Sequence, residues 1–317
     1  MERAKRLELS TPYLRLTSGG VPDVLEAMAV PESSDSRLPV FDAYPCATVV
    51  CELGEGPFVH DGRLYWVDIL QRHLHSCVGG GGDHRILAVP THLGAAAPWP
   101  GGFVTATQGG IGTLSREGEF ALLPNSPRLP PELRFNDGKR DPVGRFWCGT
   151  MAYQLTPAAG ALYCVEPDGA VRRVVEDVTI SNGLDWDAKR GLFFYIDTPT
   201  RRVDVWDYAA VSGEISNRRL FLQLPPEYGL PDGMSLDDRG RMWIAFWGGG
   251  QVIGFDLERR VAVARVLVPA SLSSSCWFDR SDRALYITSA RTGLTPEQLA
   301  REPEAGKIFR ADIPSDL

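Results

Sequence analysis

The chain has 317 residues, a formal net charge of −7 and a hydrophobic fraction of 44%, which suit a globular protein with a large core. Lysine and arginine form no basic cluster, and this argues against a nucleic-acid partner. No apolar run reaches the ~18 residues of a membrane span, and the N-terminus lacks the apolar core of a secretory signal. We therefore expect a cytoplasmic protein that binds neither nucleic acid nor membrane.

Residues 1–42 precede the repeats described below and predict a partly irregular N-terminal extension. Within it, Pro22–Val30 is compatible with a short helix, and the following PESSDSR segment has the composition of a flexible linker.

Strand-like runs rich in aromatic and β-branched residues recur along the rest of the chain. The six clearest are LYWVDI from Leu64, FVTATQ from Phe103, FWCGTM from Phe146, FFYIDT from Phe193, MWIAFW from Met242 and LYITSA from Leu285. Repeats of about 40–50 residues with several short strands each are typical of propeller blades. The sequence therefore predicts an all-β, six-bladed β-propeller over residues 43–317, as one domain.

The two ends of this domain are expected to share one blade. A strand around residues 47–52 would pair with the IFRADI segment near residue 310, and such closure removes exposed sheet edges. The glycine run at residues 79–82 predicts a loop, and PEQLAREPEA predicts a short helical excursion at the surface.

A second repeated feature lies shortly before four of the six runs. The position preceding a glycine holds Glu55 in GEGP, Asn136-Asp137 in NDG, Asn182 in SNG and Asp232 in PDG. Asn-Gly and Asp-Gly are also the commonest turn dipeptides, so any one of these alone would indicate only a turn. Their shared register instead suggests that four blades direct oxygen atoms at one point on the axis.

Carboxylate and amide oxygens without thiolates or imidazoles suit a hard divalent cation. We expect one such ion, Ca²⁺ in the first place, although Zn²⁺, Mn²⁺, Mg²⁺ or Fe²⁺ would also accept an oxygen-rich site. Arg134 lies two residues before Asn136 and would share its side of an extended strand, where it could donate to a sugar hydroxyl.

The histidines and cysteines give little support to a serine hydrolase site, a zinc site or disulfide bonds. All five histidines precede residue 93, and no GxSxG motif exists for a serine hydrolase. His73 and His75 form an HxH pair that could bind zinc, but no further ligand is evident, and a solvated outer strand is expected there. The six cysteines form no CxxC pair and are expected to be free thiols.

These motifs together resemble the SMP-30/gluconolactonase family, which includes regucalcin and bacterial aldonolactonases. The resemblance covers residues 47–313, and GEGP, RFNDGKxDPxGRxxxGTM, SNGLDW, YxID, PDGM and ExLxREPEAGxIF occur in family order. The resemblance implies a metal bound by Glu55, Asn182 and Asp232, with Asp232 also the catalytic acid/base. It further implies substrate binding by three side chains, namely Arg134, Asn136 and Gln154, and many family members carry Glu at the position of Gln154.

The function expected from this resemblance is metal-dependent hydrolysis of a sugar lactone, an aldonolactone, to the aldonic acid. The protein would act on this small molecule as a monomer or weak homodimer. Two alternatives remain open, namely a calcium-dependent phosphotriesterase or arylesterase and a non-catalytic metal-binding propeller.

Overall fold

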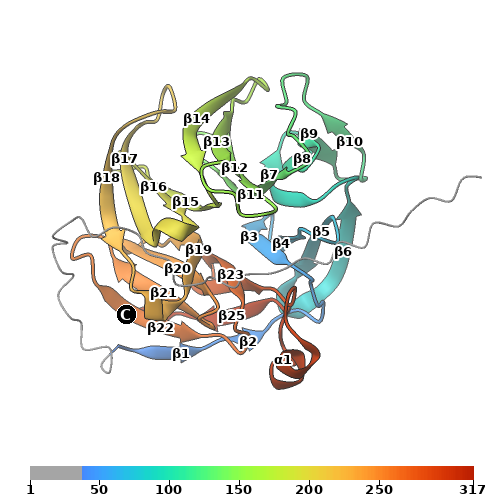
Figure 1. Cartoon of the computed structure of the whole chain (residues 1–317). Coiled ribbons are helices and arrows are strands. Elements are labelled where there is room, and N and C mark those ends of the chain that lie inside the picture. Colours follow the sequence, from blue (N-terminus) through green and yellow to red (C-terminus); the bar gives the residue numbers. More distant parts are fainter. Residues whose placement is uncertain (1–37) are drawn as a thin grey trace, which may run out of the picture.

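The structure, a computed structural model, describes residues 38–317. Six β-sheets are arranged around a central axis like the blades of a propeller, and the order of the blades follows the sequence (Figure 1). This confirms the predicted all-β, six-bladed architecture.

Four blades are meanders of four consecutive antiparallel strands. The fifth adds a strand from the N-terminal segment to such a meander, and the sixth combines three consecutive strands with another N-terminal strand. The first three blades contain β3 (Gly54–His60), β4 (Arg63–Asp68), β5 (His73–Val78) and β6 (Gly82–Ala88); β7 (Leu93–Trp99), β8 (Gly102–Thr107), β9 (Gly110–Ser115) and β10 (Phe120–Leu122); and β11 (Leu133–Arg140), β12 (Phe146–Ala152), β13 (Gly160–Val165) and β14 (Val171–Val178). The next three contain β15 (Ser181–Asp187), β16 (Leu192–Asp197), β17 (Arg202–Ala209) and β18 (Glu214–Gln223); β19 (Leu230–Leu236), β20 (Arg241–Trp247), β21 (Gln251–Asp256) and β22 (Ala262–Leu267); and β23 (Ser273–Asp279), β24 (Ala284–Ser289) and β25 (Phe309–Asp312).

The six aromatic runs recognised in the sequence form the second strand of every blade, namely β4, β8, β12, β16, β20 and β24. A second strand has hydrogen-bonded neighbours on both edges and a neighbouring blade against each face. It therefore buries nearly all of its side chains, and Trp66, Trp147 and Trp243 are fully buried. This explains why apolar residues occupy both faces of these strands instead of alternating with exposed polar ones.

The first strand of each blade lies nearest the axis and packs against the first strands of the neighbouring blades. All six carry one extra residue relative to the second strand, at the bulges between Glu55 and Phe58, Leu93 and Ala95, Phe135 and Gly138, Asn182 and Leu184, Pro231 and Met234, and Ser273 and Ser275. A bulge re-aims the side chains beside it.

Glycine at these bulges allows the inner strands to approach each other closely. A Cβ added to Gly183 would lie 2.5 Å from the backbone oxygen of Asp232, and one on Gly94 would lie 2.4 Å from the carbonyl of Phe135. At Gly183, which belongs to the repeated motif, strand-to-strand contact thus requires a residue without a Cβ.

The ring closes as predicted in the sixth blade, but through a different segment. A strand of two residues, β2 (Tyr44–Pro45), pairs antiparallel with β25, whereas residues 47–52 form no strand. That segment instead crosses to the first blade, and its Cys51 N–H donates to the carbonyl of Gly306 (2.7 Å). The closing strand therefore lies just before the predicted one.

The segment before β2 also belongs to the folded structure. Val40–Asp42, placed in the extension by the sequence, forms β1 and pairs parallel with β22 of the fifth blade. The helix expected at residues 22–30 and the linker at 31–37 lie outside the described residues. Figure 1 shows β1 and β2 beside the fifth and sixth blades.

The remaining surface excursions agree with the sequence in outline. Residues 79–81 form one 3₁₀ turn that leads into β6, and α1 (Pro296–Arg301) occupies the PEQLAREPEA segment. Thr295 caps this helix by accepting a hydrogen bond from the N–H of Gln298, whose side chain in turn accepts from the N–H of Thr295. Within residues 38–317, no helix has the length and apolar character needed to cross a bilayer.

Polar networks hold the hairpins between first and second strands in two blades. In the third blade the buried carboxylate of Asp141 accepts hydrogen bonds from the N–H (2.8 Å) and guanidinium (3.2 Å) of Arg145 and from the indole N–H of Trp147 (3.2 Å). In the fifth blade Asp237 accepts the same three kinds of bond from an arginine and a tryptophan at the same spacing. The DxxGRxW pattern is thus a structural motif.

Candidate active site

A cavity of about 140 Å³ lies on the axis at the N-terminal ends of the inner strands. Its lining includes every side chain assigned from the sequence to the metal, the substrate or catalysis, namely Glu55, Arg134, Asn136, Gln154, Asn182 and Asp232. They come from the first, third, fourth and fifth blades. The structure therefore brings the predicted set together.

A chain of hydrogen bonds fixes the amide side chains of the cavity. The guanidinium of Arg134 donates to Oδ1 of Asn136 (2.6 Å), and Nδ2 of Asn136 donates to Oδ1 of Asn182 (3.1 Å). Nδ2 of Asn182 donates in turn to the hydroxyl of Thr198 (2.9 Å). With its nitrogen held by Thr198, Asn182 keeps its carbonyl oxygen on the Asn136 side, and that oxygen retains one free lone pair.

The two carboxylates of the cavity are buried and sparsely hydrogen-bonded. Glu55 is 4% exposed and its Oε2 accepts from the N–H of Gly56 (3.0 Å). Asp232 is 5% exposed, and its Oδ1 has no hydrogen-bond partner within residues 38–317. Such a buried, unpaired oxygen is costly unless a ligand satisfies it.

Burial and mutual repulsion shift the acidity of both groups. Burial raises the pKa of Asp232 well above its ordinary value, and the nearby charges of Glu55 and Asp137 raise it further. Burial also raises the pKa of Glu55, with a further contribution from Asp137, while the Gly56 N–H and Arg134 oppose the shift. A positive charge between the two carboxylates would reverse these shifts.

The residues present therefore fit a divalent cation. Glu55, Asn182 and Asp232 offer oxygen donors only, which is the ligand set that Ca²⁺ and similar hard ions prefer. The buried Oδ1 of Asp232, which accepts no hydrogen bond within residues 38–317, is the clearest candidate for a bond to such a cation.

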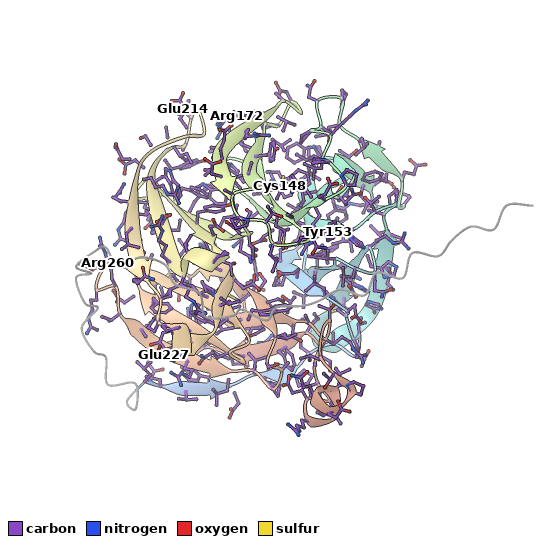
Figure 2. The ribbon with its side chains drawn as sticks, in the orientation of Figure 1. Cys148, Tyr153, Arg172, Glu214, Glu227 and Arg260 are labelled. Carbon is purple, nitrogen blue, oxygen red and sulfur yellow. The ribbon has the colours of Figure 1, made fainter. Side chains whose placement is uncertain are left out.

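The cavity wall contains residues that the sequence did not indicate. Six apolar side chains line it, namely Leu53, Met151, Leu155, Ile180, Leu230 and Trp247. The hydroxyl of Tyr153 lies 2.6 Å from Nδ1 of His92, and the guanidinium of Arg134 lies 5.9 Å from the centre of the Tyr153 ring. Tyr153 is on the inner side of the ring, unlike Glu214 and Arg260 at its outer rim (Figure 2). In the sequence, Tyr153 could have been recognised as a candidate because it adjoins Gln154, whereas no motif pointed to His92.

Asn136 and Asp137, treated together in the sequence, line different cavities. Asp137 lines a larger cavity of about 420 Å³ toward the C-terminal ends of the inner strands, together with Lys139 and Asp185. Lys139 forms an ion pair with Asp185 there (2.9 Å). Of the NDG pair, only Asn136 belongs to the candidate active site.

The expectation of a solvated strand at the HxH pair was wrong. β5 is the third strand of the first blade and four of its six residues are buried, among them His75 at 3% exposure. Burial, followed by the nearby His84 and His73, lowers the pKa of His75 to about 3. All six cysteines lie within the described residues and are free thiols, as predicted.

Three comparisons place this fold and cavity among known proteins. The chain is 44% identical to regucalcin of Oryctolagus cuniculus over 183 residues, 56% of this chain and 61% of that relative, so less than two thirds of its length is matched. It is 34% identical to "Putative sugar lactone lactonase YvrE" of Bacillus subtilis (strain 168) over 266 residues, 82% of this chain and 91% of that protein. Among solved structures, a calcium-binding protein, regucalcin, from Agrobacterium tumefaciens matches with a TM-score of 0.80 and 27% identity, over 87% of this chain and 95% of that one.

The family described as SMP-30/Gluconolactonase/LRE-like region matches residues 53–291, which run from just before the first blade into the sixth. This match contains all six lining residues assigned from the sequence. The chain therefore belongs to the SMP-30/gluconolactonase/LRE-like family.

Proposed function

We propose that the protein is a metal-dependent lactonase that opens a sugar lactone to the aldonic acid. The observation that carries this proposal is the unpartnered Oδ1 of Asp232 in a buried cavity whose other ligand atoms are oxygens. Membership of the family and the similarity to a protein named for sugar lactone hydrolysis support the same activity.

The proposed roles are those implied by the family resemblance, and they are supported by the position of these residues in one cavity. When bound, a divalent cation held by Glu55, Asn182 and Asp232 would act as a Lewis acid on the lactone carbonyl. Asp232 has two oxygens, so one can serve as ligand while the other orients and deprotonates the attacking water. Arg134 and Asn136 are already fixed by their mutual hydrogen bond and would hold the lactone ring. No covalent nucleophile is needed, because lactones are activated esters.

The decisive experiment measures ring opening in a pH-stat for five- and six-membered aldonolactones. Protein treated with a chelator should open none faster than buffer, and stoichiometric Ca²⁺, Mn²⁺ or Zn²⁺ should restore the rate. A protein that binds the cation without accelerating any of these lactones would be a non-catalytic propeller, and the proposal would fail.

One feature favours a second candidate, a calcium-dependent arylesterase or phosphotriesterase. The six apolar residues of the cavity wall offer contact to an aryl leaving group as readily as to a sugar. Phenyl acetate and a neutral organophosphate belong in the same substrate panel. Higher kcat/KM for these than for every aldonolactone would select this alternative.

Substitution of Glu55 by glutamine should separate metal binding from folding. The amide keeps the shape but removes one of the two carboxylate charges at the cation, so the Kd for Ca²⁺ measured by calorimetry should rise about tenfold or more. The metal-free variant should unfold at the same temperature as the metal-free wild type or higher, because the repulsion with Asp137 and Asp232 is reduced.

Glu132→Gln is the matched control for this prediction. Glu132 lies just before β11 and is exposed, so the same change should leave the Kd within about twofold. Equal Ca²⁺ affinity in Glu55→Gln and Glu132→Gln would remove Glu55 from the ligand set.

Gln154→Glu should shift preference toward polyhydroxylated lactones. A carboxylate accepts hydrogen bonds from hydroxyl groups more strongly than an amide does, by about 1 kcal/mol. Since Gln154 lines the cavity but is itself exposed, we expect KM for gluconolactone to fall a few-fold with little change in kcat. Unsubstituted δ-valerolactone, which has no hydroxyl to bind, should show unchanged KM and serves as the control; an equal change for both substrates would contradict this role.

A further inference from the structure

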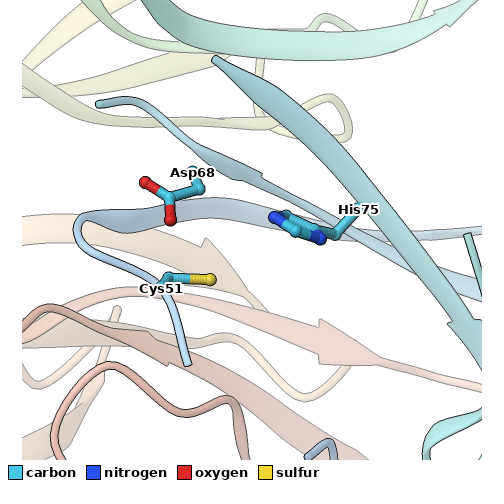
Figure 3. Close-up of side chains that lie close together, drawn as sticks. All are labelled: Cys51, Asp68 and His75. Carbon is cyan, nitrogen blue, oxygen red and sulfur yellow. The ribbon is translucent and has the colours of Figure 1, made fainter. Parts of the chain in front are cut away.

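A second group of side chains that could bind a metal lies in the first blade, and none of its three members lines the axial cavity (Figure 3). It consists of Cys51, just before β3, Asp68, the last residue of β4, and His75 of β5. One donor atom from each lies within 4.8 Å of the other two, and all three residues are buried. Two of them, Cys51 and His75, offer the sulfur and nitrogen donors that the axial cavity lacks.

The orientation of His75 is that of a ligating histidine. Its Nδ1 lies 3.1 Å from Nε2 of His84, while its own Nε2 is buried and has no hydrogen-bond partner among the residues described. With the proton on Nδ1 donated to His84, Nε2 carries the lone pair, and Figure 3 shows the His75 ring directed toward Cys51 and Asp68. Metal-bound histidines characteristically use their second nitrogen in this way, because the outer hydrogen bond fixes both the tautomer and the ring. The ring of Trp66 stacks on His75 (5.4 Å between centres) and holds it further.

Hydrogen bonds also fix the side chains of Cys51 and Asp68. The indole N–H of Trp66 donates to Sγ of Cys51 (3.3 Å), a contact that suits a thiolate. Asp68 accepts from the N–H groups of Glu52 (2.8 Å), Leu53 (3.2 Å) and Gln71 (3.3 Å). Three donors occupy three of the roughly four acceptor positions of a carboxylate and leave one for a cation.

A comparison within the ring shows which part of this cluster is ordinary. Asp197 of β16 occupies the position of Asp68 and likewise accepts from two successive backbone N–H groups, so the aspartate alone has a structural role. The residues that correspond to Cys51 and His75 in that blade are Val178 and Asp204, by the register of the strands. The cysteine and histidine are thus additions to a structural aspartate and distinguish the first blade from the fourth.

We propose that Cys51, Asp68 and His75 form a second metal site, suited to a borderline-soft divalent ion such as Zn²⁺. Thiolate, imidazole and carboxylate are its usual protein ligands. Binding forms a sulfur–metal bond and releases the Cys51 thiol proton to solvent, so thiolate and carboxylate together neutralise the ion. The metal would tie β4 and β5 to the segment leading into β3, whose second residue is Glu55. Its role is therefore to stabilise the first blade, which supplies Glu55 to the axial cavity.

Co²⁺ tests this proposal, because a thiolate ligand gives a sulfur-to-cobalt charge-transfer absorption that an all-oxygen site cannot produce. The reduced, metal-free full-length protein is titrated with Co²⁺ alone, both folded and during refolding. We expect the band in the wild type, its retention in Glu55→Gln, and its loss in Cys51→Ser. Zn²⁺ content after dialysis should fall by one equivalent per chain in Cys51→Ser.

Two further variants keep the outcome decisive. Cys46→Ala removes the least buried of the six thiols and should retain the band. His75→Gln leaves the thiol in place and should weaken Co²⁺ binding at least tenfold, which supplies the test if Cys51→Ser does not fold. A wild-type protein without the band at saturating Co²⁺, or a band that survives in folded Cys51→Ser, would overturn the proposal.

Discussion

Replacing Asp232 by asparagine or alanine is expected to lower kcat/KM for lactone opening by about a thousandfold, with cation at saturation. The carboxylate is the proposed base for the attacking water as well as a ligand, and neither substitute can accept a proton at neutral pH. The amide of Asp232→Asn would retain an oxygen donor, so this variant should bind Ca²⁺ more tightly than Asp232→Ala. Initial rates in a pH-stat and calorimetric titration with Ca²⁺ measure the two effects separately.

The control for this experiment is Asp238→Asn in the same blade. Asp238 follows β19 in an exposed turn and forms a loose ion pair with Arg283 (3.5 Å), and its neutralisation should leave the rate unchanged. If Asp232→Asn turned over lactone as fast as Asp238→Asn under saturating cation, Asp232 would not be the base.

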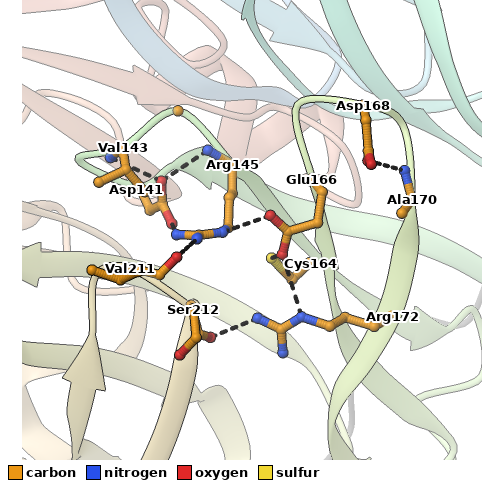
Figure 4. Close-up of polar contacts among 12 residues, drawn as sticks. Asp141, Val143, Arg145, Cys164, Glu166, Asp168, Ala170, Arg172, Val211 and Ser212 are labelled. Atoms are coloured by element: carbon orange, nitrogen blue, oxygen red, sulfur yellow. Dashed lines mark hydrogen bonds and ion pairs between the residues drawn. The ribbon is translucent and has the colours of Figure 1, made fainter.

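The largest loss of stability is expected from Asp141→Ala. Its side chain is completely buried and accepts hydrogen bonds from Arg145, Trp147 and the hydroxyl of Tyr208 (2.7 Å). Removal takes the acceptor from the Trp147 indole and the Tyr208 hydroxyl. It also takes a carboxylate from the Arg145 guanidinium, which is only 8% exposed and still pairs with Glu166 (2.7 Å; Figure 4). We expect the free energy of unfolding to fall by about 3–5 kcal/mol, measured by urea denaturation.

Asp168→Ala is the matched comparison, since it makes the same chemical change in the same blade. Asp168 lies in the exposed turn between β13 and β14 and accepts one hydrogen bond, from the N–H of Ala170 (2.9 Å; Figure 4). Its loss should cost about 0.5–1 kcal/mol. Similar unfolding midpoints and slopes for the two variants would show that the Asp141 network does not stabilise the blade.

The sequence predicted the blades well because their second strands are buried on both faces. Burial of that kind favours aromatic and aliphatic residues on both faces of the strand, and so Trp66, Trp147 and Trp243 mark three of the six runs. The common register of Glu55, Asn182 and Asp232 was equally informative. Equivalent positions in symmetric blades lie at the same height around the axis, so their side chains come close together. The structure places all three in one cavity, while their roles remain predictions.

What escaped the sequence depends on contacts between distant residues. The segment CATVVC looks more like a strand than Tyr44–Pro45, but only pairing with β25 determines which segment closes the ring. The NDG motif does not show by itself that Asn136 and Asp137, at the bulge, line different cavities. Likewise, Cys51 and His75 come close to each other only when the chain crosses from the closing segment into the first blade.

The position of β1 and β2 has a consequence for biosynthesis. Tyr44 in β2 pairs with Arg310 in β25. β2 is synthesised early and therefore has no pairing partner until almost the whole propeller has left the ribosome. Pairings so distant along the chain carry a high entropic cost of loop closure and form late. During translation the growing chain would be an open arc in which the first and the most recent blade each leave one apolar face uncovered, a state that chaperones are suited to shield.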